Sequence, residues 1–134
     1  HYLVSDKIDW SPYEGFVYTF DETKDIAWLY LVSDMMITDY SSVMFDYSLL
    51  KRPMLFFAYD LQDYKENLRG FYFDFVEEAP GPISRDTNQL INDIKSYEPL
   101  KWEDKYQTYS NKYNHVDDGH ASEKVIDLIK NRSK

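Results

Sequence analysis

Residues 35–59 read MMITDYSSVMFDYSLLKRPMLFFAY, and this stretch carries the clearest structural pattern in the chain. Its two ends, residues 35–38 and 54–59, are short apolar runs of the kind that is typical of strands buried on both faces. Residues 41–51 lie between them and predict a helix, which Pro53 prevents from continuing. The order strand, helix, strand predicts a parallel sheet in an α/β fold.

The flanking sequence extends this alternation and then becomes helical. Further strands or extended segments are predicted at residues 16–20 and 71–75, a turn at residues 80–82, and helices at residues 25–33, 86–96, 102–113 and 121–132. No internal repeat, low-complexity tract or interdomain linker interrupts the chain. We therefore expect one domain whose parallel sheet is flanked by helices and whose end is closed by helices.

We expect that domain to be partial. The chain opens with His1 rather than methionine, which suggests a piece of a longer protein. In the common strand order 3-2-1-4-5-6, the run 16–20 would be the third strand and the run 35–38 the fourth. The two strands between them in space would then precede residue 1. On this argument the runs 16–20 and 35–38 do not pair directly.

Composition narrows the classes of function. The 134 residues are 43% hydrophobic and 18% aromatic, which supplies enough apolar surface for a core. Fifteen basic and 24 acidic residues give a net charge of −9, which disfavours a nucleic-acid partner because phosphate binding needs a basic face. The absence of cysteine excludes disulfides and a thiol nucleophile and fits a reducing cytoplasm. No apolar run approaches the ~20 residues of a membrane span, and no signal peptide is recognisable.

The turn between the strand 35–38 and the next helix carries the candidate chemistry. Ligands of open α/β sheets bind outside the carboxyl ends of strands, where helix amino-termini favour a phosphate. Ser41 and Ser42 would add hydroxyl donors there. Asp46 lies four residues after Ser42, on the same helical face, and the hydroxyls of a ribose or a polyol would satisfy its carboxylate if it is buried.

The residues alone leave a second interpretation open. A serine pair before a helix is most often an N-cap, and Asp46 can simply face solvent. Other candidates are equally open. Asp39 either caps the helix or orients the site, and Arg69 either reaches a phosphate or stabilises a turn. His115 and His120 flank an acidic turn, for which a helix cap is the better interpretation than a metal site.

Several motifs in order strengthen the ligand-binding interpretation. The strings ITDYSSVMFDYSLLKRP, FFAYD, LRGFYFDF and PGP, followed by Asp117-Asp118-Gly119 and Ala121-Ser122, closely resemble the CDP-glycerol:poly(glycerophosphate) glycerophosphotransferases. The resemblance covers nearly the whole chain. It implies a GT-B architecture with two Rossmann-like halves, of which the carboxy-terminal half binds CDP-glycerol.

The resemblance also implies roles for individual residues. Ser41, Ser42 and Asp46 would contact the phosphates and hydroxyls of the donor. His1-Tyr2 resembles the family's Arg-x-His-Tyr segment, whose histidine is functional, so His1 would be catalytic and manage protons. The arginine of that segment and a second functional histidine are absent from this chain. Neither a cofactor nor a metal ion is required.

The implied reaction transfers glycerol phosphate from CDP-glycerol to the hydroxyl end of a teichoic acid chain. Its partners would be CDP-glycerol, a polyol-phosphate acceptor and the amino-terminal part of the same enzyme. The full-length protein would lie in the cytoplasm, peripheral on the inner face of the bacterial membrane. Two alternatives remain: another GT-B nucleotide-sugar glycosyltransferase, and a non-catalytic α/β interaction module, which the acidic, tyrosine-rich composition favours.

Overall fold

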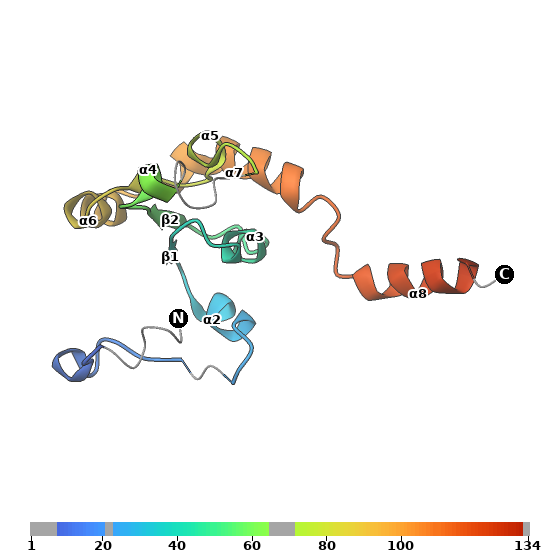
Figure 1. Ribbon diagram of the computed structural model, residues 1–134, viewed down its shortest axis with the longest axis horizontal. Helices are drawn as coiled ribbons and strands as arrows, with labels where there is room; N and C mark the ends of the chain where they lie inside the picture. The colour runs from blue at the N-terminus through green and yellow to red at the C-terminus, as the bar shows by residue number, and fades with distance from the viewer. Residues whose placement is uncertain (1–7, 21–22, 65–71, 133–134) are drawn as a thin grey trace. The chain divides into compact units, whose positions relative to one another are not determined.

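The computed structural model describes residues 8–20, 23–64 and 72–132, and the chain divides into two units. One comprises residues 1–33 and the other residues 34–134. Figure 1 shows the elements of both along the chain. Within the described residues, no helix is both long and apolar enough to cross a membrane.

The first unit holds a 3-10 turn, η1 (Ser11–Tyr13), and the helix α2 (Ala27–Val32). This helix confirms the helix predicted at residues 25–33. The strand predicted at residues 16–20 is wrong: this segment follows a turn in which the Phe16 and Val17 N–H groups both donate to the Tyr13 carbonyl. A strand needs a neighbouring strand to bond, and the described part of this unit contains none.

The second unit is built on a parallel sheet, which confirms the predicted α/β class. The strands are β1 (Met36–Thr38), β2 (Met54–Phe57) and β3 (Ile83–Ser84), in the order β1-β2-β3 (Figure 1). Each strand neighbours the next along the chain, as the last three strands of the order 3-2-1-4-5-6 would. The run 16–20 is not among the strands of this sheet, so the expectation about its pairing with β1 stays a prediction.

Burial differs between the strands. Met54, Leu55 and Phe56 of the central strand β2 are fully buried, as predicted. The prediction for β1 was wrong, because Ile37 is 48% exposed. β1 lies at an edge of the described sheet, where nothing described covers that side chain.

Six helices accompany the sheet in the described part of this unit. They are α3 (Val43–Ser48), α4 (Leu61–Asp63), α5 (Phe75–Glu78), α6 (Thr87–Lys95), α7 (Pro99–Tyr113) and α8 (Ala121–Arg132). The patterns at residues 41–51, 86–96, 102–113 and 121–132 are thereby confirmed as helices, although α7 begins three residues earlier than predicted.

The helices pack on the sheet from two sides. α6 contacts β2 and β3, and the Ser84 hydroxyl donates to Asp93 across this contact at 2.7 Å. α3 contacts β1 and α7 instead, and Figure 1 shows α3 and α7 on the other side of the strands from α6. This arrangement is the layered α/β architecture that the alternation predicts.

The extended segment predicted at residues 71–75 is wrong where the structure describes it. Asp74 accepts a hydrogen bond from the Glu77 N–H and so caps α5, which begins at Phe75. The aromatic run is therefore the entrance to a helix: Phe75 is buried against Phe56, with ring centroids 5.2 Å apart.

The short helix α5 is tied to α7 by a polar cluster around Glu78. Its carboxylate accepts from Lys112 at 2.6 Å and from Tyr113 at 2.7 Å. These hydrogen bonds, that of Lys112 first, hold the pKa of Glu78 below its ordinary value. The ionised carboxylate is thus favoured in the folded chain.

This cluster predicts an acid-dependent contribution to stability. A lowered folded-state pKa stabilises the fold above the ordinary glutamate pKa of 4.5, and that stabilisation is lost as the pH falls through the folded-state value. Glu78→Gln should therefore unfold at a lower urea concentration than the parent at pH 7. The difference between the two unfolding midpoints should shrink as the pH falls. The effect is small because Lys112 is half exposed. Glu98→Gln, which breaks a more exposed pair with Lys101, is the control, and an equal pH-dependent difference there would contradict the prediction.

Candidate functional site

The candidate site lies at the carboxyl edge of the sheet. Because β1 and β2 are parallel, the residues that follow Thr38 and those that follow Phe57 emerge at the same edge. The first loop brings Asp39, Tyr40, Ser41 and Ser42 there, and the second brings Tyr59 and Asp60. This edge is where open α/β sheets bind their ligands.

Tyr40 joins the two loops. Its hydroxyl donates to the Asp60 carboxylate at 2.5 Å, and its ring lies on Tyr64 with centroids 3.9 Å apart. Burial and the hydrogen bond to Asp60 raise the pKa of Tyr40, so the phenol stays a protonated donor at neutral pH. The bond fixes the start of the loop that carries Ser41 and Ser42, residues 39–42, relative to β2. We call this loop the serine turn.

Sequence reasoning missed this pair. The signal was available, because Tyr40 and Asp60 each follow one of two neighbouring parallel strands at a similar distance. Asp39, the neighbouring candidate, is exposed, and none of the hydrogen bonds described involves its side chain. The structure therefore does not support the cap that was one of its two expected roles.

The serine turn is formed differently from a capped helix. Ser42 occupies the N-cap position of α3, but its φ and ψ of −62° and −13° are helical and its side chain makes no capping hydrogen bond. The N-cap interpretation of the serine pair is thus wrong for Ser42. The N–H groups of Met44 and Phe45 donate to the carbonyls of Ser41 and Ser42 at 3.2 and 3.1 Å. These two N–H groups are therefore occupied, and the serine hydroxyls add donors to the turn.

Ser42 and Asp46 share the exposed side of α3. Both side chains are exposed, whereas Met44, Tyr47 and Ser48 are buried. The shared face agrees with their spacing of four residues. Because Asp46 is exposed, its carboxylate does not need a buried partner, and the argument from burial does not apply to it. Ser41 is half-buried beside them.

α7 packs against α3 on the side away from Ser42 and Asp46. Asn114 donates to the Ser48 hydroxyl oxygen at 2.6 Å, and the Tyr106 hydroxyl donates to the Ser48 carbonyl at 3.3 Å. Phe45 stacks on Tyr109 with ring centroids 5.7 Å apart. A side chain on the exposed face of α3 therefore stands on a packed support, which is what a precise binding site needs.

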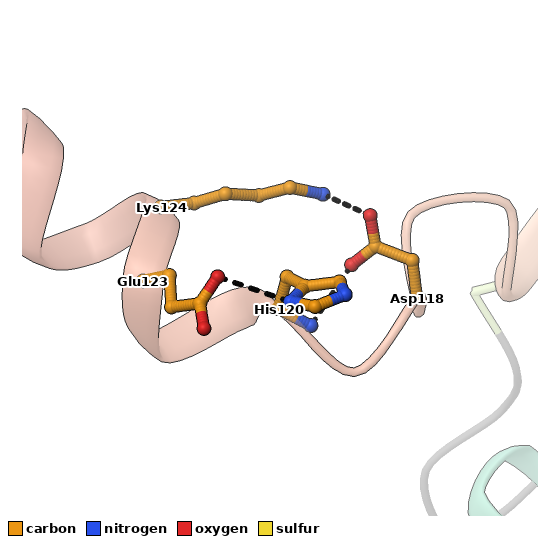
Figure 2. Close-up of polar contacts among 4 residues, drawn as sticks. All are labelled: Asp118, His120, Glu123 and Lys124. Carbon is orange, nitrogen blue, oxygen red and sulfur yellow. Dashed lines mark hydrogen bonds and ion pairs between the residues drawn. The ribbon is translucent and has the colours of Figure 1, made fainter.

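The histidines were candidates for proton transfer or metal binding. His1 and Arg69 lie outside the described residues. In Figure 2, the Asp118 carboxylate accepts from the His120 N–H at 3.0 Å and pairs with Lys124 at 2.8 Å, while His120 Nδ1 lies 3.0 Å from Glu123. The hydrogen bond from Lys124 lowers the pKa of Asp118 most. These contacts form the start of α8, and the described residues contain no cluster able to hold a metal ion.

The fold and the site define the chain as part of an α/β protein of the class that binds ligands at the carboxyl edge of a parallel sheet. It belongs to the CDP-Glycerol:Poly(glycerophosphate) glycerophosphotransferase family, whose family model matches residues 1–131.

Relatives and solved structures agree with this membership. The chain is 47% identical over 131 residues to the teichoic acid poly(glycerol phosphate) polymerase of Bacillus subtilis (strain 168), covering 96% of this chain and 18% of that protein. It is 42% identical to a structure of the wall teichoic acid polymerase TagF, with a TM-score of 0.86 over 98% of this chain and 33% of that one. A TagF variant soaked with CDPG matches with the same identity, TM-score and coverage. The chain thus spans between about a fifth and a third of the length of these proteins.

Proposed function

We propose that the protein carrying this chain transfers glycerol phosphate from CDP-glycerol to the terminal hydroxyl of a teichoic acid chain. This chain would supply the donor-binding part. The observation that carries the proposal is the exposed Ser42–Asp46 face at the carboxyl edge of the sheet, in a chain that matches the glycerophosphotransferase family from residue 1 to residue 131. The CDP-glycerol in the name of the family, and the CDPG soak of a TagF variant, support CDP-glycerol as the donor.

Each candidate residue has a binding role that follows from the chemistry of its side chain. The hydroxyls of Ser41 and Ser42 donate to phosphate oxygens, and the Asp46 carboxylate accepts from hydroxyls of the donor. The Tyr40–Asp60 hydrogen bond holds the turn that presents the serines. Neutral donors suit this position because they stabilise phosphate charge without binding the product as tightly as a cation would.

The reaction is a displacement at phosphorus. The acceptor hydroxyl oxygen bonds to the phosphorus that bears glycerol, and the bond from that phosphorus to the bridging oxygen breaks, so that CMP leaves. The proton of the acceptor hydroxyl must be taken up, and we assign this to His1 on the sequence resemblance alone. Such steps depend mainly on positioning and on stabilisation of phosphate charge.

The remaining parts of the proposal concern the whole protein. We place this chain in the carboxy-terminal half of a GT-B enzyme, with the amino-terminal half and the second functional histidine supplied by the rest of the protein. The full-length enzyme acts in the cytoplasm, at the inner face of the membrane.

The test is a calorimetric titration of CDP-glycerol into the full-length protein and into a Ser42→Ala, Asp46→Ala double variant. Hydrogen bonds to charged groups contribute about 1.5–3 kcal/mol each, so the variant, which loses two of them, should bind roughly a hundredfold more weakly or worse. A Ser122→Ala, Asp127→Ala variant removes the same residue types from the exposed surface of α8 and should bind normally.

The other outcomes separate the alternatives. Unchanged binding in the Ser42, Asp46 variant would place the donor elsewhere. Preference for a UDP- or CMP-sugar would indicate another nucleotide-sugar transferase. Failure of the intact protein to bind any cytidine nucleotide would favour the non-catalytic interaction module.

A further inference from the structure

A pocket lies at the amino-terminal edge of the sheet, opposite the edge that carries the candidate donor site. It has a volume of about 320 Å³. Its lining comes from two segments: the turn before β2, with Lys51, Arg52 and Pro53, and the segment that enters α7. Pro53 directly precedes the first residue of β2, whereas the serine turn follows the last residue of β1. The pocket is therefore separate from the candidate donor site, and none of the roles assigned above uses it.

The lining combines cations with aromatic rings. Tyr97, Trp102 and Tyr106 supply the rings, Lys51 and Arg52 supply two positive charges, and Glu103 is the one acidic residue in the lining. This balance is unusual in a chain of net charge −9. Lysine and arginine side by side suit a phosphate group, and aromatic faces cover the carbon skeleton that links one phosphate to the next.

The two cations are held in different ways. Arg52 is hydrogen-bonded to Tyr47, a fully buried residue of α3, so its guanidinium is fixed against the core. Lys51 is exposed and forms no ion pair with any residue that the structure describes. Its backbone has a φ of 54°, in the left-handed region that favours glycine. A lysine here is a less stable choice than glycine, which is consistent with a role for its charge.

We propose that this pocket binds a polyol-phosphate segment of the acceptor or product chain, away from the reacting end. The proposal rests on the proposed function, which supplies a ligand of this chemistry. The volume lies at the small end of the roughly 300–1,000 Å³ of ligand pockets, which suits a short segment of such a chain. A flat anionic membrane surface fits less well than a single chain, because it would also face the exposed Glu98 and Asp104, which do not line the pocket.

The decisive variant is Lys51→Gly in the full-length protein. Glycine removes the charge and also relieves the left-handed backbone, so the unfolding midpoint in urea should rise. Binding of a poly(glycerol phosphate) oligomer of defined length, measured by calorimetry, should nevertheless weaken about tenfold. A variant that is more stable yet binds less cannot owe the loss to misfolding. Lys51→Arg should retain most of the affinity.

Two further variants test the site itself. Trp102→Leu keeps an apolar side chain but removes the ring, and should weaken the oligomer severalfold. Lys101→Gln removes a positive charge from the same end of α7, but Lys101 pairs with Glu98 at 2.7 Å and does not line the pocket. Oligomer binding should be unchanged in this control. An equal loss in Lys101→Gln and Lys51→Gly would overturn the proposal in favour of general charge attraction.

CDP-glycerol titrated into the same variants separates this inference from the proposed function. Lys51→Gly should bind the donor normally, because the pocket and the serine turn lie at opposite edges of the sheet. If the intact protein does not bind CDP-glycerol, the proposed function fails. If it binds the donor but its affinity for the oligomer does not depend on Lys51, this inference alone fails. Loss of binding to anionic lipid vesicles in Lys51→Gly, with the oligomer unaffected, would assign the two cations to a membrane surface and reject the pocket.

Discussion

Replacing Gly81 with alanine is expected to destabilise the fold by about 3 kcal/mol. An added Cβ would lie 1.8 Å from the carbonyl oxygen of Met54 and 2.9 Å from its carbonyl carbon. Both atoms belong to the backbone of the central strand β2, which cannot rotate aside as a side chain can. The strand or the Gly81 segment must move, and the hydrogen bond from the Phe56 N–H to the Pro82 carbonyl, 2.9 Å long, lies next to the clash.

Urea unfolding gives the size of this effect, and amide exchange locates it. The Phe56 and Ala58 N–H groups, which donate to Pro82 and Ser84, should lose protection first. Gly119→Ala is the matched control: Gly119 has a φ of +81°, but its added Cβ would meet no atom within 4 Å. Conformational strain alone costs about 1 kcal/mol there. A loss at Gly81 no larger than that at Gly119 would show that the close approach to β2 is relieved at little cost.

The elements that the sequence predicts well are those set by local pattern. The apolar run that becomes β2 lies between a proline and an aspartate, and the helix at residues 121–132 has clear helical spacing. Both signals act within about one turn or one strand length, so no knowledge of the tertiary structure is needed to find them. The alternation around them is enough to predict a parallel α/β sheet.

Other elements depend on contacts between distant residues, and these were missed. β3 has two residues, and it is a strand because Phe56 and Phe57 of β2 lie beside it. The run at residues 16–20 has better strand composition than β3, but no strand among the described residues pairs with it. Strand propensity therefore ranked these two segments in the wrong order, since pairing outweighs composition.

Two of the errors could have been avoided with local rules. Asp74 followed by Glu77 is a helix-start pattern, and it precedes a helix here despite the aromatic residues around it. Pro99 occupies the first turn of α7, a position that proline favours. In both cases the predicted boundary followed an apolar or aromatic run and not the capping residue or proline at which the helix begins.

The position of the candidate residues in the fold was predicted better than their contacts, and their binding role stays a prediction. Ser41, Ser42 and Asp46 follow from the strand–turn–helix pattern; the structure places the two serines at the carboxyl edge and Asp46 one turn further along α3. The bond between Tyr40 and Asp60 joins residues twenty positions apart and depends on the parallel pairing of β1 and β2. The pocket at the amino-terminal edge could not be predicted, because it joins the turn at Lys51 to the start of α7.

Phe56→Ala is expected to produce the largest loss of stability, about 3–5 kcal/mol. Phe56 is fully buried in the central strand, and its ring lies edge-to-face on Phe75 and 3.6 Å from the Cβ position of Gly81. Truncation leaves a cavity bounded by β2 and by the segment that leads into β3. Neither boundary can close the cavity without breaking the hydrogen bonds of the sheet, so little of the loss is recovered by relaxation.

The neighbouring residue provides the control for this substitution. Phe57 belongs to the same strand but points to the other face, is only partly buried, and has its ring 5.6 Å from the exposed Tyr59. Phe57→Ala should cost less than half as much as Phe56→Ala in urea unfolding at neutral pH. Equal losses would mean that both faces of β2 carry similar packing energy. Because β2 leads to Asp60 at one end and follows Arg52 and Pro53 at the other, a partly unfolded Phe56 variant should weaken the donor and the oligomer together. The site variants Ser42→Ala, Asp46→Ala and Lys51→Gly should each affect only one ligand, which distinguishes loss of the scaffold from loss of a contact.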